Sequence, residues 1–357
     1  MERKIKRFGD LYKDISSRDN IEEALRNSSV GKMNYAEVKE VFKDKDFHIE
    51  KIVRMLEEGS YECSEYVRFI KENKGKKRVI SKLPFFPDRV IQHAILQVVE
   101  PIWKASLITH TFQSIKGRGV HSCLKEVRKA VQHDRVLFCL QIDVEQFYPS
   151  IVGRVLKEVL RRKIKCKDTL RLLDIIVDGD EGIPIGNYIS QYFGNLFLSK
   201  LDHYTKEVLG IKHYYRYCDD LIVLSDSKDE LKEVLRFVEL HLEEIELTIK
   251  SNFQIYPISS KRGVDCLGYV VFPNKVEIRA SIAREFSNKV RIMRRRRKVD
   301  MGVISSYYGW FKHCDSLALW CKITNPLLEV AKGENREALL VLSRKLKLNT
   351  RRRNVYY

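Results

Sequence analysis

The sequence lacks the features that would place it in a membrane or in an oxidising compartment. No apolar run in its 357 residues approaches the ~20 that span a bilayer, and the first residues, Met-Glu-Arg-Lys-Ile-Lys, form no apolar signal segment. The eight cysteines are dispersed and include no Cys-x-x-Cys pair, which disfavours disulfides and a zinc site and favours packed thiols. We therefore expect a cytoplasmic protein that does not use a membrane partner.

Acidic residues are scarce relative to basic ones. The chain has 66 Lys and Arg against 48 Asp and Glu, a formal net charge of +18. Such a surplus is typical of proteins that bind polyanions, with nucleic acid as the first candidate and an anionic membrane surface as the second. The length suits two or three small domains or one multi-lobed enzyme, and we find no repeat, low-complexity segment or long linker.

Apolar spacing predicts helices toward both ends of the chain and strands in the middle. Residues 1–70 and the basic segment beyond 280 have helical periodicity, and 90–99 reads as a buried helix that ends before Pro101. Further helices are expected over 152–171, 190–208 and 229–244, and strands over 136–142, 213–216, 221–224 and 266–272. Strands and helices arranged around two acidic segments favour an α+β fold.

The first acidic segment is Tyr217-Cys218-Asp219-Asp220, which lies between two apolar, strand-like runs. Two adjacent carboxylates at the tip of a hairpin concentrate negative charge, and hard oxygen ligands select Mg²⁺ or Mn²⁺. Taken alone, the segment is equally typical of a solvated Asp-Asp turn, because Asp is common in turns. Cys218 has no evident histidine partner in the sequence and is expected to be a packed thiol.

The second acidic position is Asp143, at the end of the strand over 136–142. Adjacent antiparallel strands would bring Asp143 beside Asp219. Two carboxylates and a backbone carbonyl, that of Val144, could then hold two divalent ions about 4 Å apart, the arrangement that stabilises attacking and leaving oxygens in phosphoryl transfer. Taken alone, Asp143 could equally cap the end of its strand.

Together these segments resemble the motifs of reverse transcriptases, in the order found in that family. The segments that carry the resemblance are Lys76-x-Arg78-x-Ile80, 87–94, 112–121, 143–151, 186–202, 217–220 and 266–269. Residues 305–316 resemble the thumb of the family. The resemblance covers roughly residues 70–320 and implies a right-hand polymerase, with an antiparallel-sheet palm and mainly helical fingers and thumb.

The resemblance implies roles for individual residues. Asp143 and Asp219 match the catalytic metal ligands, and Asp220 matches the acidic residue beside them. Tyr148 matches an aromatic residue beneath the incoming sugar, where a bulky ring would clash with a 2′-hydroxyl; a core aromatic is the alternative. Lys76 and Arg78 match cations that hold the triphosphate, although such a run is also typical of a solvated turn.

The segment between the acidic motifs departs from many reverse transcriptases. Those enzymes have Gln before Gly186 and Pro after Ser190, whereas this chain has Ile185 and Gln191. That pattern resembles the reverse transcriptases of diversity-generating retroelements, in which it accompanies error-prone copying. Ile185, Gly186 and Gln191 are expected at the nucleotide, and Ser190 could cap its helix or, with Gln191, touch the templating base.

The expected nucleic-acid contacts are basic. Arg118, in a Gly-Arg-Gly loop, is a candidate for the template backbone or an ordinary loop residue. The run Arg294, Arg295, Arg296 and Arg297 is either a solvated helix face or a grip on the template–primer duplex, and the net charge favours the grip.

The resemblance also implies an organisation and a function. It places an N-terminal helical segment at 1–70, fingers at 71–135, a palm at 136–272 with a fingers insertion at about 152–180, and a basic helical thumb and tail at 273–357. The implied activity is RNA-directed DNA synthesis from dNTPs with Mg²⁺ or Mn²⁺, on an RNA template, within a diversity-generating retroelement that also supplies a small basic accessory protein. The alternatives are a retron-like or abortive-infection-like antiviral reverse transcriptase and a catalytically silent RNA-binding protein.

Overall fold

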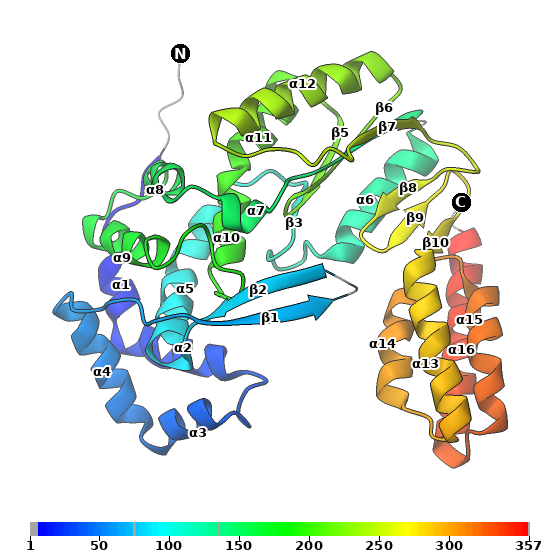
Figure 1. The fold of residues 1–357 in the computed structure, drawn as a ribbon, viewed down its shortest axis with the longest axis horizontal. Coiled ribbons are helices and arrows are strands. Elements are labelled where there is room, and N and C mark those ends of the chain that lie inside the picture. The colour runs from blue at the N-terminus through cyan, green and yellow to red at the C-terminus, as the bar shows by residue number, and fades with distance from the viewer. Residues whose placement is uncertain (1–5, 74–75, 135, 356–357) are drawn as a thin grey trace. The chain divides into compact units, whose positions relative to one another are not determined.

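The computed structural model describes residues 6–73, 76–134 and 136–355, and it combines helices and β-sheets in an α+β fold, as predicted (Figure 1). The chain forms two compact units. The first contains residues 1–116, 141–221 and 232–253, and the second contains 117–140, 222–231 and 254–357. Strands β4 and β6 each carry the chain from one unit to the other.

The first unit begins with helices, as the apolar spacing predicts. They are α1 (Tyr12–Ser16), α2 (Arg18–Ser29), α3 (Ala36–Lys43), α4 (Lys45–Glu57) and α5 (Val90–Ala105). The side chain of Ser17 caps α2 and that of Asp44 caps α4. The expected end of α5 before Pro101 was wrong, because the helix continues through Pro101 to Ala105. Burial of Trp103 beyond the proline offsets the missing helical hydrogen bond.

Between α4 and α5 lies a two-stranded hairpin. Its strands, β1 (Val67–Asn73) and β2 (Lys76–Lys82), pair antiparallel from Val67 opposite Lys82 to Asn73 opposite Lys76. A short π-helix, η1 (Phe85–Arg89), then leads into α5. The segment Lys76-x-Arg78-x-Ile80, singled out in the sequence, lies within β2.

The central part of the chain builds a five-stranded sheet and the helices around it. Its elements are β3 (Thr111–Phe112), α6 (Val120–His133), β4 (Phe138–Asp143), α7 (Phe147–Ser150), α8 (Gly153–Arg161), α9 (Lys167–Val177), α10 (Ser190–Phe197), α11 (Ser199–His203), η2 (Tyr204–Val208), β5 (His213–Tyr217), β6 (Asp220–Ser225), α12 (Lys228–Glu244) and β7 (Gln254–Pro257). The strand order is β3-β5-β6-β4-β7. This order places β4, which ends at Asp143, directly beside β6.

The helix predicted over 152–171 is interrupted. The chain between α8 and α9 is held by Phe8, whose N–H donates to the carbonyl of Lys163 at 2.8 Å and whose carbonyl accepts from the N–H of Lys165 at 2.8 Å. Because residues 163–165 use their backbone groups for this pairing, they cannot continue the helix. The helix predicted over 190–208 is likewise divided, into α10, α11 and η2.

The second unit contains a three-stranded sheet and a helical bundle. Its elements are β8 (Val264–Cys266), β9 (Tyr269–Val271), β10 (Val276–Ile278), α13 (Ala280–Arg296), α14 (Met301–Phe311), α15 (Leu317–Thr324), η3 (Asn325–Glu329) and α16 (Gly333–Val355). Aromatic rings fill the bundle: Phe286 lies 5.7 Å from Phe311 and 5.5 Å from Trp320 between ring centroids. The sheet has the order β10-β9-β8.

The single strand predicted over 266–272 was wrong. The segment is a tight hairpin in which Leu267 and Gly268 both have positive φ, 51° and 100°, as a two-residue turn requires. A Cβ on Gly268 would lie 2.6 Å from the Trp310 ring, so both conformation and space demand glycine. Because apolar residues lie on both sides of this turn, hydrophobicity alone does not predict it.

Candidate active site

The acidic hairpin predicted from the sequence is present in the first unit. Strands β5 and β6 are neighbours in the sheet and are joined by two residues, Cys218 and Asp219. Cys218 has a φ of 58°, which turns the chain, and its side chain is buried, as expected for a packed thiol. Burial raises the pKa of Cys218 to about 12, so the thiol stays protonated. Asp219 is half-buried, and Asp220 begins β6 in an exposed position.

The structure brings Asp143 close to Asp219. Burial raises the pKa of the Asp219 carboxyl, the Cys218 and backbone hydrogen bonds lower it, and the charge of Asp143 raises it again. The two carboxylates therefore interact, as the placement of β4 beside the hairpin leads one to expect.

A residue that the sequence reasoning missed completes this group. The Lys250 ammonium forms an ion pair with the Asp143 carboxylate, and its backbone N–H donates to the Asp143 carbonyl at 2.8 Å. Lys250 follows α12 in a short segment whose Ile249 forms an antiparallel bridge with Val144. No local motif marks it, because the contact joins residues 107 positions apart.

The donor chemistry of this group fits a divalent cation. Charge on Asp219 is unfavourable within the protein because of burial and of Asp143, and the ammonium of Lys250 offsets this effect in part. A hard cation would offset the same repulsion through carboxylate oxygens, the ligands that Mg²⁺ prefers. Within the described residues no three His, Cys, Asp or Glu side chains converge as a ready-made metal cluster, so the arrangement is a pair of carboxylates rather than a closed cage.

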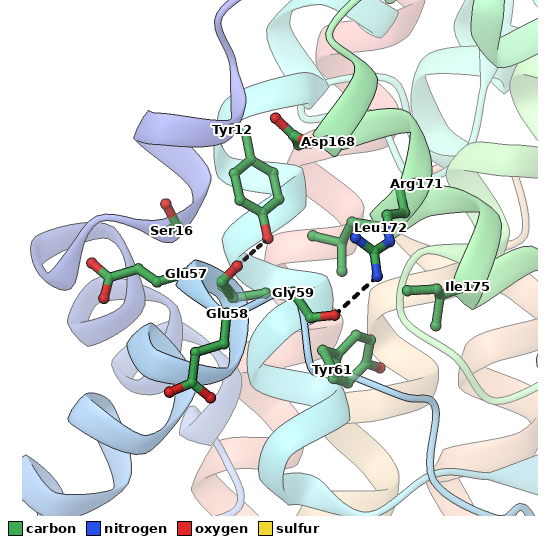
Figure 2. Close-up of a pocket in the computed structure, with 11 residues that line it drawn as sticks. Tyr12, Ser16, Glu57, Glu58, Gly59, Tyr61, Asp168, Arg171, Leu172 and Ile175 are labelled. Carbon is green, nitrogen blue, oxygen red and sulfur yellow. Dashed lines mark hydrogen bonds between the residues drawn. The ribbon is translucent and has the colours of Figure 1, made fainter.

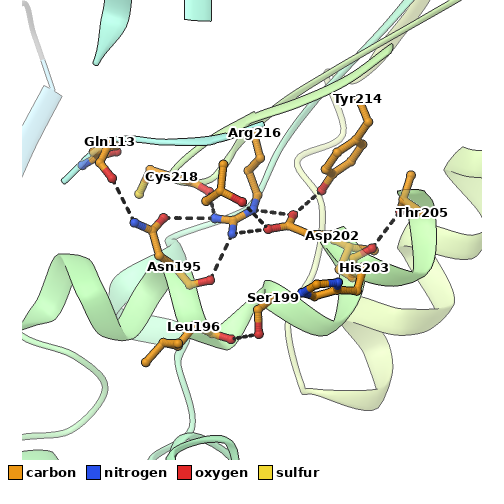
Figure 3. Close-up of polar contacts among 12 residues, drawn as sticks. Gln113, Asn195, Leu196, Ser199, Asp202, His203, Thr205, Tyr214, Arg216 and Cys218 are labelled. Carbon is orange, nitrogen blue, oxygen red and sulfur yellow. Dashed lines mark hydrogen bonds and ion pairs between the residues drawn. The ribbon is translucent and has the colours of Figure 1, made fainter. Parts of the chain in front are cut away.

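A buried ion pair holds the hairpin that carries Asp219 (Figure 3). Arg216, in β5, has no exposed surface and pairs with the equally buried Asp202 of α11 at 2.5 Å. Its guanidinium also donates to the carbonyl of Cys218 at 2.9 Å and to that of Asn195 at 3.0 Å. The Asn195 side chain in turn donates to the carbonyl of Gln113 at 3.0 Å. This network ties the turn before Asp219 to α10 and α11.

Asp202 is fully satisfied inside this network, which explains how a charge is tolerated there. Besides Arg216, it accepts from the hydroxyls of Tyr214 at 2.7 Å and Thr111 at 2.9 Å. The sequence did contain a signal for this pair. Arg216 is a lone charge in a strand that is otherwise apolar, and such a charge is buried only with a partner.

Tyr148 lies against the acidic hairpin formed by β5 and β6. It sits in α7, half-buried, and its hydroxyl accepts from the Cys218 thiol at 3.1 Å. Burial raises the pKa of Tyr148, so the ring stays neutral. Gly194 of α10 makes room for it: a Cβ there would lie 3.1 Å from the Tyr148 ring and 3.0 Å from that of Phe147. The place of Tyr148 in α7 and the space left by Gly194 together put the Tyr148 ring beside Asp219.

The segment around Gly186 packs against the β1–β2 hairpin. The carbonyl of Ile185 accepts from the N–H of Ser81 at 3.1 Å. Gly186 has a φ of 143°, and a Cβ there would lie 2.3 Å from the Ser81 carbonyl oxygen. Gly186 was expected to permit close approach of a nucleotide; in the structure it permits close approach of β2.

Ser190 and Gln191 make internal contacts. The Ser190 hydroxyl is buried and donates to the carbonyl of Pro184 at 2.8 Å, closing the preceding loop. The expectation that Ser190 caps α10 was wrong, because Ile189 occupies the cap position and no side chain caps the helix. Gln191 is exposed and accepts a hydrogen bond from Ser114.

The remaining predicted residues lie in several elements. Arg78 is exposed on β2, and the Lys76 side chain lies outside the described residues. Arg118 belongs to the second unit, as does the run from Arg294 to Arg297 at the end of α13. The four arginines are exposed, and Arg294 pairs with Glu329 at 2.6 Å.

A separate cavity of about 410 Å³ opens in the first unit between α1, α9 and the chain after α4 (Figure 2). Tyr12 and Arg171 cross it, donating to the carbonyls of Leu56 at 2.6 Å and Gly59 at 3.2 Å. No sequence-predicted site residue lines it. All eight cysteines are free, and no described helix is long and apolar enough to cross a membrane.

Comparison with known proteins places this site in a family. Residues 70–271, more than half of the chain, match the family described as reverse transcriptase (RNA-dependent DNA polymerase), and the chain belongs to this family. Members generally use divalent metal ions. The matched range contains Asp143, Tyr148, Asp219, Asp220 and Lys250.

Individual relatives are distant. Protein YkfC of Escherichia coli K12 is 26% identical over 153 residues, which cover 39% of this chain and 40% of that protein. The chain thus spans well under half the length of this curated relative. Among solved structures, an apo telomerase from Candida tropicalis without its C-terminal domain gives a TM-score of 0.45 at 14% identity, covering 60% of this chain and 55% of that one. Telomerase from Candida albicans with a TWJ fragment of telomeric RNA gives 0.49 at 10% identity, covering 81% and 64%.

Proposed function

We propose that the chain is an RNA-directed DNA polymerase that makes cDNA on an RNA template from dNTPs. The observation that carries the proposal is the interaction of Asp143, at the end of β4, with Asp219, on a hairpin held by Arg216, within a chain of the reverse transcriptase family. Two carboxylates that repel each other in the absence of a cation are suited to bind one.

The residues that would hold Mg²⁺ or Mn²⁺ are Asp143, Asp219, Asp220 and the Val144 carbonyl. Bound there, the ions would neutralise phosphate charge and promote attack by the primer hydroxyl. Arg216 fixes the Cys218 carbonyl and so orients the turn from which Asp219 projects. The Lys250 ammonium balances Asp143 and would stay beside the phosphates as a further positive charge.

Sugar selection and triphosphate binding fall to neighbouring side chains. The Tyr148 ring, held by Cys218 and accommodated by Gly194, would exclude a ribose 2′-hydroxyl and favour dNTPs. Lys76 and Arg78, on β2, would hold the triphosphate. Gly186 and Gln191 would approach the nucleotide or template from α10 and the loop before it.

The elements support the right-hand division of the chain. We assign residues 1–70 to an N-terminal helical segment, 71–135 to fingers, 136–272 to a palm with a fingers insertion at about 152–180, and 273–357 to a thumb. The catalytic hairpin and β4 then belong to the palm, and the exposed Arg294–Arg297 run to a thumb that grips the duplex together with Arg118.

Primer extension on an RNA template with Mg²⁺ tests the proposal. Wild-type protein should extend the primer, and Asp219→Ala and Asp220→Ala should reduce extension by at least about a hundredfold, because each removes a ligand from the metal site. Glu277→Ala, on the second unit's small sheet, is the control for removal of a half-buried carboxylate that pairs with Lys275. Equal extension by wild type and the Asp219 variant would refute the assignment.

We further propose that the copying is error-prone and belongs to a diversity-generating retroelement, with a small basic accessory protein as partner. Ile185 and Gln191, at the positions usually held by Gln and Pro, support this subtype. An apolar side chain in place of a hydrogen-bonding one loosens discrimination between bases. Ile185→Gln should lower misincorporation opposite template adenine, measured by sequencing the cDNA; an unchanged error spectrum would count against it.

The second candidate is a reverse transcriptase of a bacterial antiviral system. The same motif supports it, because some of those enzymes share parts of the altered segment. Gene neighbourhood separates the two: a template repeat, a near-identical variable repeat and a gene for a small basic protein indicate the retroelement. Their absence, with protection against phage that depends on Asp219, indicates defence.

A further inference from the structure

A second, smaller cavity in the first unit is lined by cations that the polymerase site does not use. It encloses about 60 Å³ between the start of α3, the end of β2, the start of α5 and the loop at 186–188. Its basic side chains are Lys32, Lys82 and Arg89. Glu37 lines the cavity too, but its carboxylate pairs with Lys82 at 3.0 Å and accepts the N–H of Phe85 at 3.1 Å. Lys32 and Arg89 have no acidic partner among the described residues.

Arg89 is the less satisfied of the two cations. Its Nε atom is buried and finds no hydrogen-bond partner in the described part of the chain. The guanidinium lies over the Tyr188 ring, 5.5 Å from the centroid, which stabilises the charge only in part. A buried donor left unpaired is costly, and such groups are usually satisfied by protein, water or a ligand.

The electrostatics of the cavity agree with this geometry. Burial lowers the pKa of Arg89, and burial together with the nearby Arg89 charge lowers that of Lys32. His93, which stacks on Tyr188 at 3.9 Å, has its pKa lowered to about 3 by burial and then by both cations. The imidazole stays neutral and adds no charge, so an anion would relieve the remaining repulsion.

We propose that this cavity binds a phosphate group of a single-stranded RNA, which is the template under the function proposed above. The cavity, at about 60 Å³, has room for a small anionic group such as phosphate. Tyr35 lines the same cavity with 57% of its surface exposed, and cations beside an exposed aromatic ring are how proteins hold single strands. Gly186, which also lines it, connects the cavity to the loop before α10.

The test measures RNA binding without synthesis. Anisotropy of a short labelled single-stranded RNA is titrated with full-length protein between about 50 and 200 mM salt, without dNTP or Mg²⁺. Arg89→Gln and Lys32→Gln should each weaken binding about tenfold and reduce the salt slope by about 0.7, the value for one phosphate contact on a single strand. Arg54→Gln, which removes an exposed arginine of α4 in the same unit, should change neither quantity.

The outcomes separate the inference from the function. Unchanged RNA affinity and salt slope in both Arg89→Gln and Lys32→Gln would overturn the inference. Loss of inorganic phosphate binding in these variants, with unchanged RNA affinity, would also overturn it and would assign the cavity to a free anion. Arg89→Lys keeps the charge and should restore much of the binding if Arg89→Gln folds poorly, as judged by circular dichroism. Primer extension is run in parallel: weakened RNA binding by the pocket variants, with no extension by wild type, would refute the polymerase and leave the phosphate site standing.

Discussion

At the scale of single residues, the site balances the charges of two carboxylates against that of one lysine. Asp143 and Asp219 repel each other, and Lys250 offsets that repulsion through its ion pair with Asp143. Both partners of that pair are one-third exposed, so the pair contributes little to stability and remains free to exchange for a stronger cation. The charge balance can therefore be tested by substituting Lys250 or by varying the Mg²⁺ concentration.

Lys250→Met tests this balance. It should lower the Tm by less than about 1 °C without divalent ions, because the variant lacks about 0.5 kcal/mol of ion pairing. Mg²⁺ should then raise the Tm of this variant more than that of wild type, since it alone offsets the carboxylates. Differential scanning fluorimetry with and without Mg²⁺ gives both values, and Asp219→Asn should suppress the Mg²⁺ response. The same Mg²⁺ response in Lys250→Met and wild type would contradict the account.

Arg216 and Asp202 differ from that pair because both are completely buried. Arg216→Met should cost about 3–5 kcal/mol of unfolding free energy, because it leaves the Asp202 charge uncompensated. Adding Asp202→Leu should recover part of that loss, and urea denaturation followed by circular dichroism measures both. Arg18→Met, which breaks surface pairs with Glu22, Asp46 and Glu50, should cost less than about 1 kcal/mol. A double variant less stable than Arg216→Met would contradict this reading.

At the scale of elements, the loop before α10 and strand β2 act as one piece. The Ile185 carbonyl accepts from Ser81, and Gly186 lies against the Ser81 carbonyl oxygen. Two segments assigned to nucleotide binding from separate motifs therefore share a backbone contact. A substitution that shifts β2 at Ser81 is therefore expected to shift the loop at Gly186 as well.

Gly186→Ala tests that contact. The added Cβ would meet the Ser81 oxygen at 2.3 Å and the φ of 143° suits only glycine, so we expect at least about 2 kcal/mol of destabilisation. Gly210→Ala is the matched control, with a φ of 67° and nothing within 4 Å, and should cost about 1 kcal/mol. Urea denaturation compares the two, and equal destabilisation would show that β2 does not press on Gly186.

Sequence patterns predicted most elements but not where they break. Hydrophobic period and turn residues identified the acidic β5–β6 hairpin, α12 and the basic C-terminal helices. They failed where a distant segment decides the local structure. Phe8 holds residues 163–165 out of a helix, and the Trp310 ring selects glycine in the β8–β9 turn. Neither partner is close in sequence, so no window of local periodicity contains it.

At the scale of the whole molecule, the net charge of +18 predicts a strong dependence of nucleic-acid binding on salt. Arg295→Gln combined with Arg296→Gln should weaken primer–template binding and reduce the slope of log K against log salt by about 1.8, or 0.9 for each duplex phosphate that the protein no longer neutralises. Lys13→Gln combined with Lys39→Gln removes equal charge from exposed positions of the first unit and should leave the slope unchanged. Equal slopes for the two double variants would mean that net charge alone, and not α13, determines binding.

The sequence by itself determined the family and the α+β class, and it singled out Asp143, Asp219 and Asp220 as candidate metal ligands, because metal ligands and turn residues are constrained locally in type and spacing. Only the tertiary structure decided what surrounds them. The Lys250 ammonium pairs with Asp143, Asp202 compensates the charge of Arg216, and Lys32 and Arg89 line the same cavity. In each case the two residues come from different segments of the chain. Charges buried by folding require partners, and the fold, which places those partners, is not written in any one segment.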